Sequence, residues 1–368
     1  MKWSWKLTRL AGIDVYVHAT FFILIAWIAL AYWQAEGNIA AVISGVGFIL
    51  ALFACVVLHE LGHALTARRY GIRTRHITLL PIGGIAALER MPEDPKQEMI
   101  VALAGPAVNL VIALGLWLWL SASNSVVAAG ELDVVEGPFL GRLMAVNVML
   151  AVFNMLPALP MDGGRVFRAA LAMRMDQAAA TETAARLGQW LAMGLGLLGL
   201  LYNPLLMFIA LFVWVGAAAE AQSAQIKSSL FGVSVGQAML TDYQTLLSDD
   251  PLSRAVELTL AGSQKDFPIL LDRTITGVLT QTDLVKGLQA QGERARVGDW
   301  MQREIQSAEF DEPLERVLER LQGSQCRLIS VTRGGRLAGI INLDNFVEFL
   351  TIQAALQRRA RAGKSLQQ

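Results

Sequence analysis

The stretch of sequence that decides the fold is ILALFACVVLHELGHALTA, residues 49–67, where two histidines and a glutamate interrupt an apolar run. The run from Ala40 to Ala67 is long enough to cross a bilayer as a helix, since about 20 apolar residues suffice. Positions four apart share a helix face, so His59 and His63 can present both imidazoles to one metal ion. Ionisable groups inside a membrane span are costly and are functional by default, which indicates a buried metal site.

The spacing His59-Glu60-Leu61-Gly62-His63 is the H-E-x-x-H arrangement of zinc hydrolases, in which the glutamate is the general base. Catalytic zinc usually keeps three protein ligands and one open position for water. We expect Asp162 to be the third ligand, because it follows the fourth apolar run on the side of the membrane where the second run ends. Two alternatives stay open: Glu89 as the third ligand, and Asp162 as the N-cap of a short helix.

Composition points to a membrane protein. The chain has 368 residues, of which 54% are hydrophobic and 17% charged, and its mean hydropathy is +0.45. That is too apolar for an ordinary soluble protein. The 31 basic and 31 acidic residues balance, so charge gives no reason to expect a nucleic-acid partner. The two cysteines, Cys55 and Cys326, are far apart and offer neither a disulfide framework nor a cysteine metal site.

Several apolar runs predict a multi-pass helical protein. The six expected spans are Val17–Trp33, Ala40–Ala67, Met99–Ser121, Phe139–Leu156, Leu187–Tyr202 and Pro204–Ala219. The segment Ile72–Glu89 is too short between its polar ends to be a span, and it contains Pro81 and a glycine pair. Its β-branched residues favour a hairpin or a re-entrant segment, which survives at membrane depth only when it is buried in protein or lines a wet cavity.

Basic residues predict the orientation, because cytoplasmic flanks of spans are rich in Lys and Arg. Basic residues precede the first span and follow the second, fourth and sixth, and acidic residues lie in the loop between the third and fourth. We therefore expect a cell-membrane protein with both termini cytoplasmic, and Arg142 is the one basic residue on the wrong side. The charged residues on which this orientation rests are Lys2, Lys6, Arg9, Arg68, Arg69, Arg73, Arg75, Arg165, Arg168, Arg174, Lys227, Glu131, Asp133 and Glu136.

The C-terminal part is an internal repeat. Val235-Gly-Gln-Ala-Met239 matches Val297-Gly-Asp-Trp-Met301, and two further motifs recur at the same spacing of 62 residues. A fixed period indicates one supersecondary unit used twice. We expect a soluble α/β module. The predicted organisation is a membrane domain at 1–220, a linker at 221–230, repeats at 231–290 and 291–355, and a polar tail at 356–368.

The membrane part resembles the site-2 protease family of intramembrane metalloproteases. The matching motifs stand in family order and cover about residues 10–220. They are the HELGH stretch at 59–63, Pro-Ile-Gly-Gly at 81–84, Ala-Gly-Pro-Ala-Val-Asn at 104–109, and Asp-Gly-Gly at 162–164 preceded by Asn154 and Pro157.

This resemblance implies one zinc ion per chain, held by His59, His63 and Asp162, with Glu60 as the base. It implies that Asn154 lies near the active site and helps to hold an unwound substrate. The implied activity is regulated intramembrane proteolysis, in which transmembrane segments of membrane-anchored proteins are cleaved within the lipid bilayer.

The repeat resembles a tandem CBS-domain pair, a module that often binds adenine nucleotides such as ATP or AMP and regulates an attached enzyme. In the first copy, Thr280 and Asp283 fit the ribose-contacting pattern of that family. In the second copy, Asn342 and Asn345 depart from it, so we expect at most one nucleotide per chain. A structural role, or a homodimer formed through the CBS domains, stays open as an alternative.

Two other functions are compatible with parts of this pattern. A CBS-regulated membrane transporter would also combine apolar spans with the repeat, but it leaves the zinc motif unexplained. A catalytically inactive, protease-like scaffold would keep the fold, but the intact Glu60 argues against it.

Overall fold

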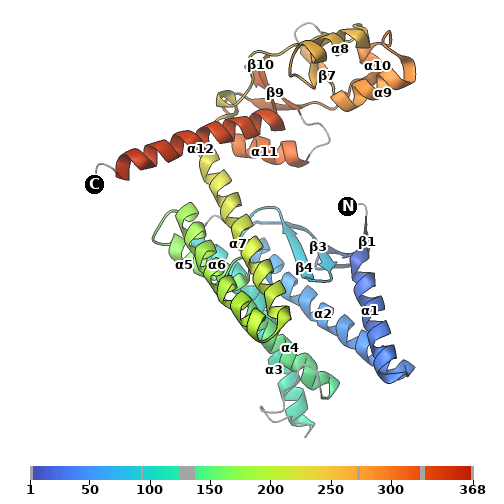
Figure 1. The fold of residues 1–368 in the computed structure, drawn as a ribbon, viewed down its shortest axis with the longest axis vertical. Coiled ribbons are helices and arrows are strands. Elements are labelled where there is room, and N and C mark those ends of the chain that lie inside the picture. Colours follow the sequence, from blue (N-terminus) through green and yellow to red (C-terminus); the bar gives the residue numbers. More distant parts are fainter. Residues whose placement is uncertain (1–2, 93, 124–136, 272–273, 324–327, 366–368) are drawn as a thin grey trace. The chain divides into compact units, whose positions relative to one another are not determined.

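The computed structural model describes residues 3–92, 94–123, 137–271, 274–323 and 328–365 (Figure 1). The acidic residues Glu131, Asp133 and Glu136, used above for orientation, lie outside this part, as does Cys326. The chain forms two compact units, Met1–Ala224 and Gln225–Gln368. The first unit carries the long apolar helices and the second carries two small sheets with their helices.

Five helices in the described part of the first unit are long and apolar enough to span a membrane. They are α1 (Ala19–Glu36), α2 (Ile39–Arg69), α3 (Pro95–Ala122), α6 (Gln177–Leu201) and α7 (Pro204–Leu230). The remaining expected span is α4 (Phe139–Asn154), which is apolar but has 16 residues. At 1.5 Å per residue it is about 24 Å long, less than the ~30 Å hydrocarbon core. The multi-pass helical fold is confirmed, with one of its helices short.

A four-stranded sheet accompanies the helices. Its order is β1 (Ser4–Leu10), β2 (Ile13–His18), β3 (Thr74–Leu80) and β4 (Gly83–Leu88), with β2 and β3 parallel and the other pairs antiparallel. The hairpin expected at 72–89 is β3–β4. It joins a second hairpin, β1–β2, that the sequence analysis did not predict.

The first helix starts later than expected. The predicted span began at Val17, but Ile13, Val15 and Val17 are buried at alternate positions, as in a strand with one covered face. The strand ends at His18, whose ring nitrogen accepts a hydrogen bond from the Thr20 backbone N–H and caps α1. The helix therefore begins two residues after the approximate start expected at Val17, because the alternating apolar residues before it form a strand.

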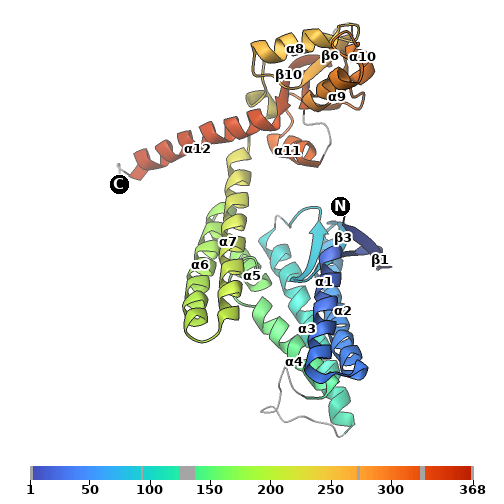
Figure 2. The ribbon, with the colours of Figure 1, turned by 45° about the vertical axis from the view of Figure 1, so that its right-hand side comes forward.

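Small residues bring the central helices close together. Gly62 of α2 lies against the Ala104 carbonyl of α3, so close that an added Cβ would come within 2.8 Å of its oxygen. Small residues at such contacts allow membrane helices to approach closely. Figure 2 shows α6 and α7 side by side, and there Gly199 faces the backbone of Met207 across the turn that joins them.

The second unit repeats one pattern of elements. The first sheet has the order β5-β6-β7 and the second the order β10-β9-β8. Leu252 and Leu314, which begin α8 and α11 and are 62 residues apart, are both fully buried. The elements are β5 (Leu246–Leu247), α8 (Leu252–Ala261), β6 (Phe267–Leu271), β7 (Thr274–Leu279), α9 (Gln281–Gln291), α10 (Val297–Trp300), β8 (Gln306–Glu309), α11 (Leu314–Gly323), β9 (Leu328–Arg333), β10 (Arg336–Asn342) and α12 (Leu343–Ser365).

The two repeats are interlocked. Leu240, just after the first motif, exchanges backbone hydrogen bonds of 2.8 and 3.1 Å with Ile340 of the second sheet. Gln302, just after the second motif, exchanges bonds of 3.0 and 2.9 Å with Val278 of the first sheet. Each repeat therefore adds a backbone pairing to the sheet of the other. For this reason the two structural halves of the unit do not coincide with the expected repeat boundaries 231–290 and 291–355.

The segment 221–230, expected as a linker, is helical. α7 continues without a break through it to Leu230. Leu230 is 2% exposed and packs in the core of the second unit with Val235 and Leu314. The last turns of α7 therefore belong to that core.

Candidate active site

The two histidines of the HELGH stretch lie near the C-terminal end of α2 and face the same way. His59 is 7% exposed and His63 is 4% exposed, so both are buried in the helical unit. Their Nε2 atoms lie 3.1 Å apart, as expected for positions one helical turn apart on one face.

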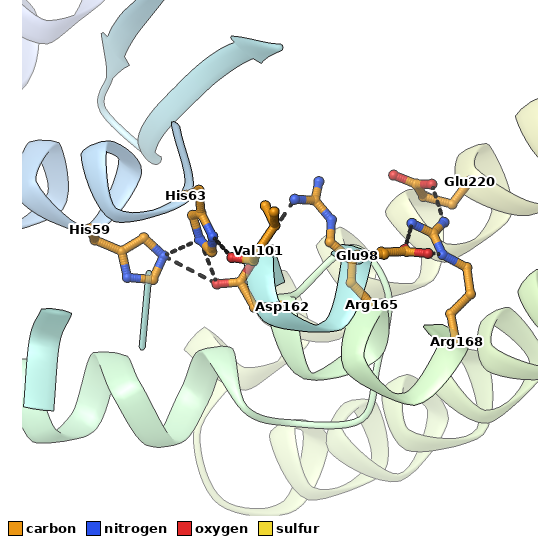
Figure 3. A network of polar contacts seen from close by, with 8 residues as sticks. All are labelled: His59, His63, Glu98, Val101, Asp162, Arg165, Arg168 and Glu220. Atoms are coloured by element: carbon orange, nitrogen blue, oxygen red, sulfur yellow. Dashed lines mark hydrogen bonds and ion pairs between the residues drawn. The ribbon is translucent and has the colours of Figure 1, made fainter. Parts of the chain in front are cut away.

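Asp162 completes a three-residue cluster (Figure 3). Its Oδ2 lies 3.2 Å from His59 Nε2 and 3.1 Å from His63 Nε2, and its side chain is buried. Asp162 is the first residue of α5 (Asp162–Ala172), and the N-cap is Met161, so the alternative of Asp162 as the N-cap is wrong. Gly164 packs directly on the backbone of Ala158, where a Cβ would collide with it, and this holds the start of α5 in the tight turn after α4.

The cluster fits a zinc ion. Its three ligand atoms lie within 4.8 Å of one another, and the donor set is two imidazoles and a carboxylate. Atoms bound to one tetrahedral zinc at about 2.0–2.1 Å lie about 3.3 Å from one another, close to the separations seen here. The room beside the nitrogens depends on Gly105 of α3, because a Cβ there would collide with Nε2 of both histidines.

Each histidine is oriented by a bond from its other ring nitrogen. His59 Nδ1 lies 2.9 Å from Oδ1 of Asn109, and His63 Nδ1 lies 2.8 Å from the carbonyl oxygen of Val101. Both acceptors belong to α3. The sequence analysis used Asn109 only as part of the Ala-Gly-Pro-Ala-Val-Asn motif and assigned it no role. An asparagine inside an apolar span was the available signal, but its partner depends on how α3 is rotated against α2, where Asn109 is fully buried.

Glu60 lies beside the hairpin. An added Cβ on Gly84 of β4 would come within 2.9 Å of the Glu60 Cγ, so the strand passes directly against this side chain. Asn154 is the last residue of α4. Glu89 lies apart from the cluster at the exposed end of β4, where it is 3.9 Å from Arg75. Among the described residues, the structure thus brings Asp162 to the histidines in preference to Glu89.

Thr280 and Asp283 meet at the start of α9. Thr280 caps the helix by accepting from the Asp283 N–H, and its hydroxyl donates to Asp283 Oδ2 over 2.7 Å. Gln302 donates to the same oxygen over 2.7 Å. In the second copy, Asn342 caps α12 by accepting from the Asn345 N–H, and Asn345 Oδ1 is buried with no partner among the described residues. The two copies therefore differ in charge at matching positions.

Comparison with known proteins identifies the fold family. Residues 47–136 and 127–195 match the peptidase family M50, and residues 235–290 and 297–352 match the CBS domain. The chain belongs to the site-2 protease family, peptidase family M50, and carries a tandem CBS pair. A zinc metalloprotease of Methanocaldococcus jannaschii is 29% identical over 354 residues, which are 96% of this chain and 97% of that protein.

The chain is also similar to two further proteins. The stage IV sporulation protein FB of Bacillus subtilis is 28% identical over 141 residues, 38% of this chain and 43% of that protein. The solved structure of the site-2 protease from Methanocaldococcus jannaschii is 35% identical and covers 60% of this chain and 95% of that chain, with a TM-score of 0.45. The protein is a zinc metalloendopeptidase of the site-2 protease type, so the transporter alternative is wrong.

Proposed function

We propose that this site-2 protease cleaves transmembrane segments of membrane-anchored proteins, using one zinc ion held by His59, His63 and Asp162. The observation that carries the proposal is the convergence of three buried ligand atoms within 4.8 Å, next to a glycine that leaves them room. His63 lies on α2 and Asp162 on α5, and they are 99 positions apart in the sequence. The arrangement therefore depends on the fold of the whole helical unit.

Glu60 is the proposed general base. It follows the first ligand directly in the chain, its side chain is partly buried, and it is not one of the three converging groups. Zinc at this site supplies Lewis-acid activation of water and of the scissile carbonyl. Glu60 takes the proton from the attacking water and returns it to the amide nitrogen that leaves as an amine.

The hairpin is the proposed substrate-binding element. Among the described residues β4 is an edge strand of its sheet, so one row of its backbone groups pairs with no strand of that part of the chain, and β4 passes against Glu60. A transmembrane helix has all its amides bonded internally and must unwind before water can attack. We expect the unwound segment to add to β4 as a strand. We assign Asn154, at the end of α4, to holding this segment, as the family resemblance implies.

Alanine variants of the three ligands test the zinc site. His59→Ala, His63→Ala and Asp162→Ala should each lower the zinc content of the purified protein, because one of three protein ligands is lost. Glu89→Ala is the matched control, since it removes an exposed carboxylate outside the cluster. Zinc lost in Glu89→Ala and kept in Asp162→Ala would contradict the proposal.

We also propose that the CBS pair faces the cytoplasm and binds one adenine nucleotide through the first copy. Asp283 supports this, because it is a partly buried carboxylate in the first turn of α9, paired with a hydroxyl that is suited to a ribose. Asn345 has no charge at the matching position. If no nucleotide binds, the pair serves as a dimerisation element.

A further inference from the structure

A buried ion cluster lies beside the zinc ligands and joins three helices (Figure 3). Arg168 of α5 is 6% exposed and Glu98 of α3 is 3% exposed. The Arg168 Nε donates to Glu98 Oε1 over 2.8 Å, and its Nη2 donates to the same oxygen. The Arg168 Nη1 donates over 3.1 Å to Oε2 of Glu220 on α7.

This pair is costly to bury. Removing two charges from water costs several kcal/mol per ion, and the attraction between them often only offsets this. The pair is also incompletely bonded, because Glu98 Oε2 has no hydrogen-bond partner among the described residues. Replacing a buried ion pair by an apolar contact of similar volume is often neutral or stabilising. The pair therefore calls for an explanation beyond stability, such as a fixed relative position of the two helices.

The two helices that Arg168 and Glu98 join both carry parts of the metal site. Glu98 lies three residues before Val101 on α3, and the Val101 carbonyl orients His63. Arg168 lies six residues after Asp162 on α5. The ion pair thus connects the helix that orients one ligand to the helix that supplies another.

We propose that Arg168 is a positioning residue for Asp162. This inference rests on the zinc site proposed above. Zinc ligands must hold their distances within about 0.2 Å, while α5 has only 11 residues and starts in a turn. The Arg168–Glu98 bond fixes α5 along α3 and so places Asp162 Oδ2 opposite the two ring nitrogens.

The same guanidinium ties this arrangement to α7. Glu220 of α7 accepts a third Arg168 hydrogen bond, which comes from Nη1. The placement of Asp162 therefore depends on α7 as well as on α3. Because the Glu220 side chain is 30% exposed, Glu220→Gln should weaken zinc binding less than Glu98→Gln does.

Zinc affinity of the purified full-length protein, measured by chelator competition, tests the proposal. Arg168→Met should weaken zinc binding about 10–100-fold, the usual cost of losing support behind a ligand. Arg168→Lys keeps the charge but cannot bond Glu98 and Glu220 in the same forked geometry, and should also weaken it. Arg186→Met is the matched control, because Arg186 pairs with Glu182 on the exposed surface of α6.

A double-mutant cycle separates positioning from general stability. If Arg168 acts through Asp162, Arg168→Lys should cost zinc affinity in the wild-type background and none in the Asp162→Ala background. Equal losses in both backgrounds, or wild-type affinity in a folded Arg168→Lys protein, would overturn the inference. Unchanged zinc binding in Asp162→Ala alone would instead overturn the zinc site itself, so the two failures are distinguishable.

Discussion

His59 and Asn109 face each other inside the helical unit, with Nδ1 of the ring 2.9 Å from Oδ1 of the amide. The amide oxygen can only accept, so the ring donates from Nδ1 and leaves the lone pair of Nε2 free for a metal. The Val101 carbonyl does the same for His63. The two histidines therefore have their metal-binding tautomers set by α3 before any ion arrives.

Asn109→Ala should lower zinc affinity about 10–100-fold, because the tautomer and the ring orientation of His59 are no longer fixed. The measurement is chelator competition on the purified protein. Asn147→Ala is the control, since Asn147 is equally buried but bonds to Cys55 and Leu143. Similar zinc affinity in the two variants would show that Asn109 has no special role.

Gly105→Ala should abolish zinc binding, because the new Cβ would collide with Nε2 of both histidines. Gly115→Ala lies on the same helix and has open space around the added Cβ, so it should bind zinc normally. Zinc content of both variants, measured together with their thermal stability, checks this. Normal zinc content in Gly105→Ala would mean that the metal lies elsewhere.

The topology can be tested by labelling single cysteines in a chain from which Cys55 and Cys326 have been replaced. A cysteine at Ser123, after α3, should react from outside the cell, and one at Ser234, after α7, only after the membrane is opened. Arg142 is the one basic residue on the side opposite to that expected, and its guanidinium lies over the Phe48 ring at 4.3 Å. Labelling of both sites from the same side would refute it.

Nucleotide binding should depend on one copy of the repeat. Asp283→Ala should weaken the binding of ATP or AMP to the full-length protein, and Asn345→Ala, at the matching position, should not. Calorimetry measures the binding, and melting without nucleotide shows whether Asp283→Ala still folds after losing its bonds to Thr280 and Gln302. Equal binding by both variants, or no binding by the wild type, would contradict the proposed site.

The sequence predicted the elements with strong local signals. Long apolar runs determine the spans, and the 62-residue repeat determines the second unit, because both signals are carried by neighbouring residues. The meeting of His59, His63 and Asp162 could be expected because the basic flanks predict that the second and fourth runs end on the same side of the membrane. The strand β2 was missed because Val15 and Val17 are as apolar as the helix that follows them.

Other features depend on contacts that no local pattern encodes. The bond between Arg168 and Glu98 joins residues 70 apart and follows from how α3 and α5 are rotated. The interlocking of the repeats is of the same kind, since Leu240 could pair with either sheet on sequence grounds alone. Such contacts are set by tertiary packing, and a single sequence gives only the residue types that can form them.

The most direct test of the account is the Glu60→Gln protein, assayed for cleavage of a transmembrane substrate in detergent with its zinc content measured in parallel. Glutamine keeps the shape of the side chain but cannot accept the proton. We predict that zinc stays at the wild-type level while cleavage falls by about 10²–10⁴-fold, the usual contribution of a general base. Cleavage at the wild-type rate by the zinc-loaded variant would contradict the account.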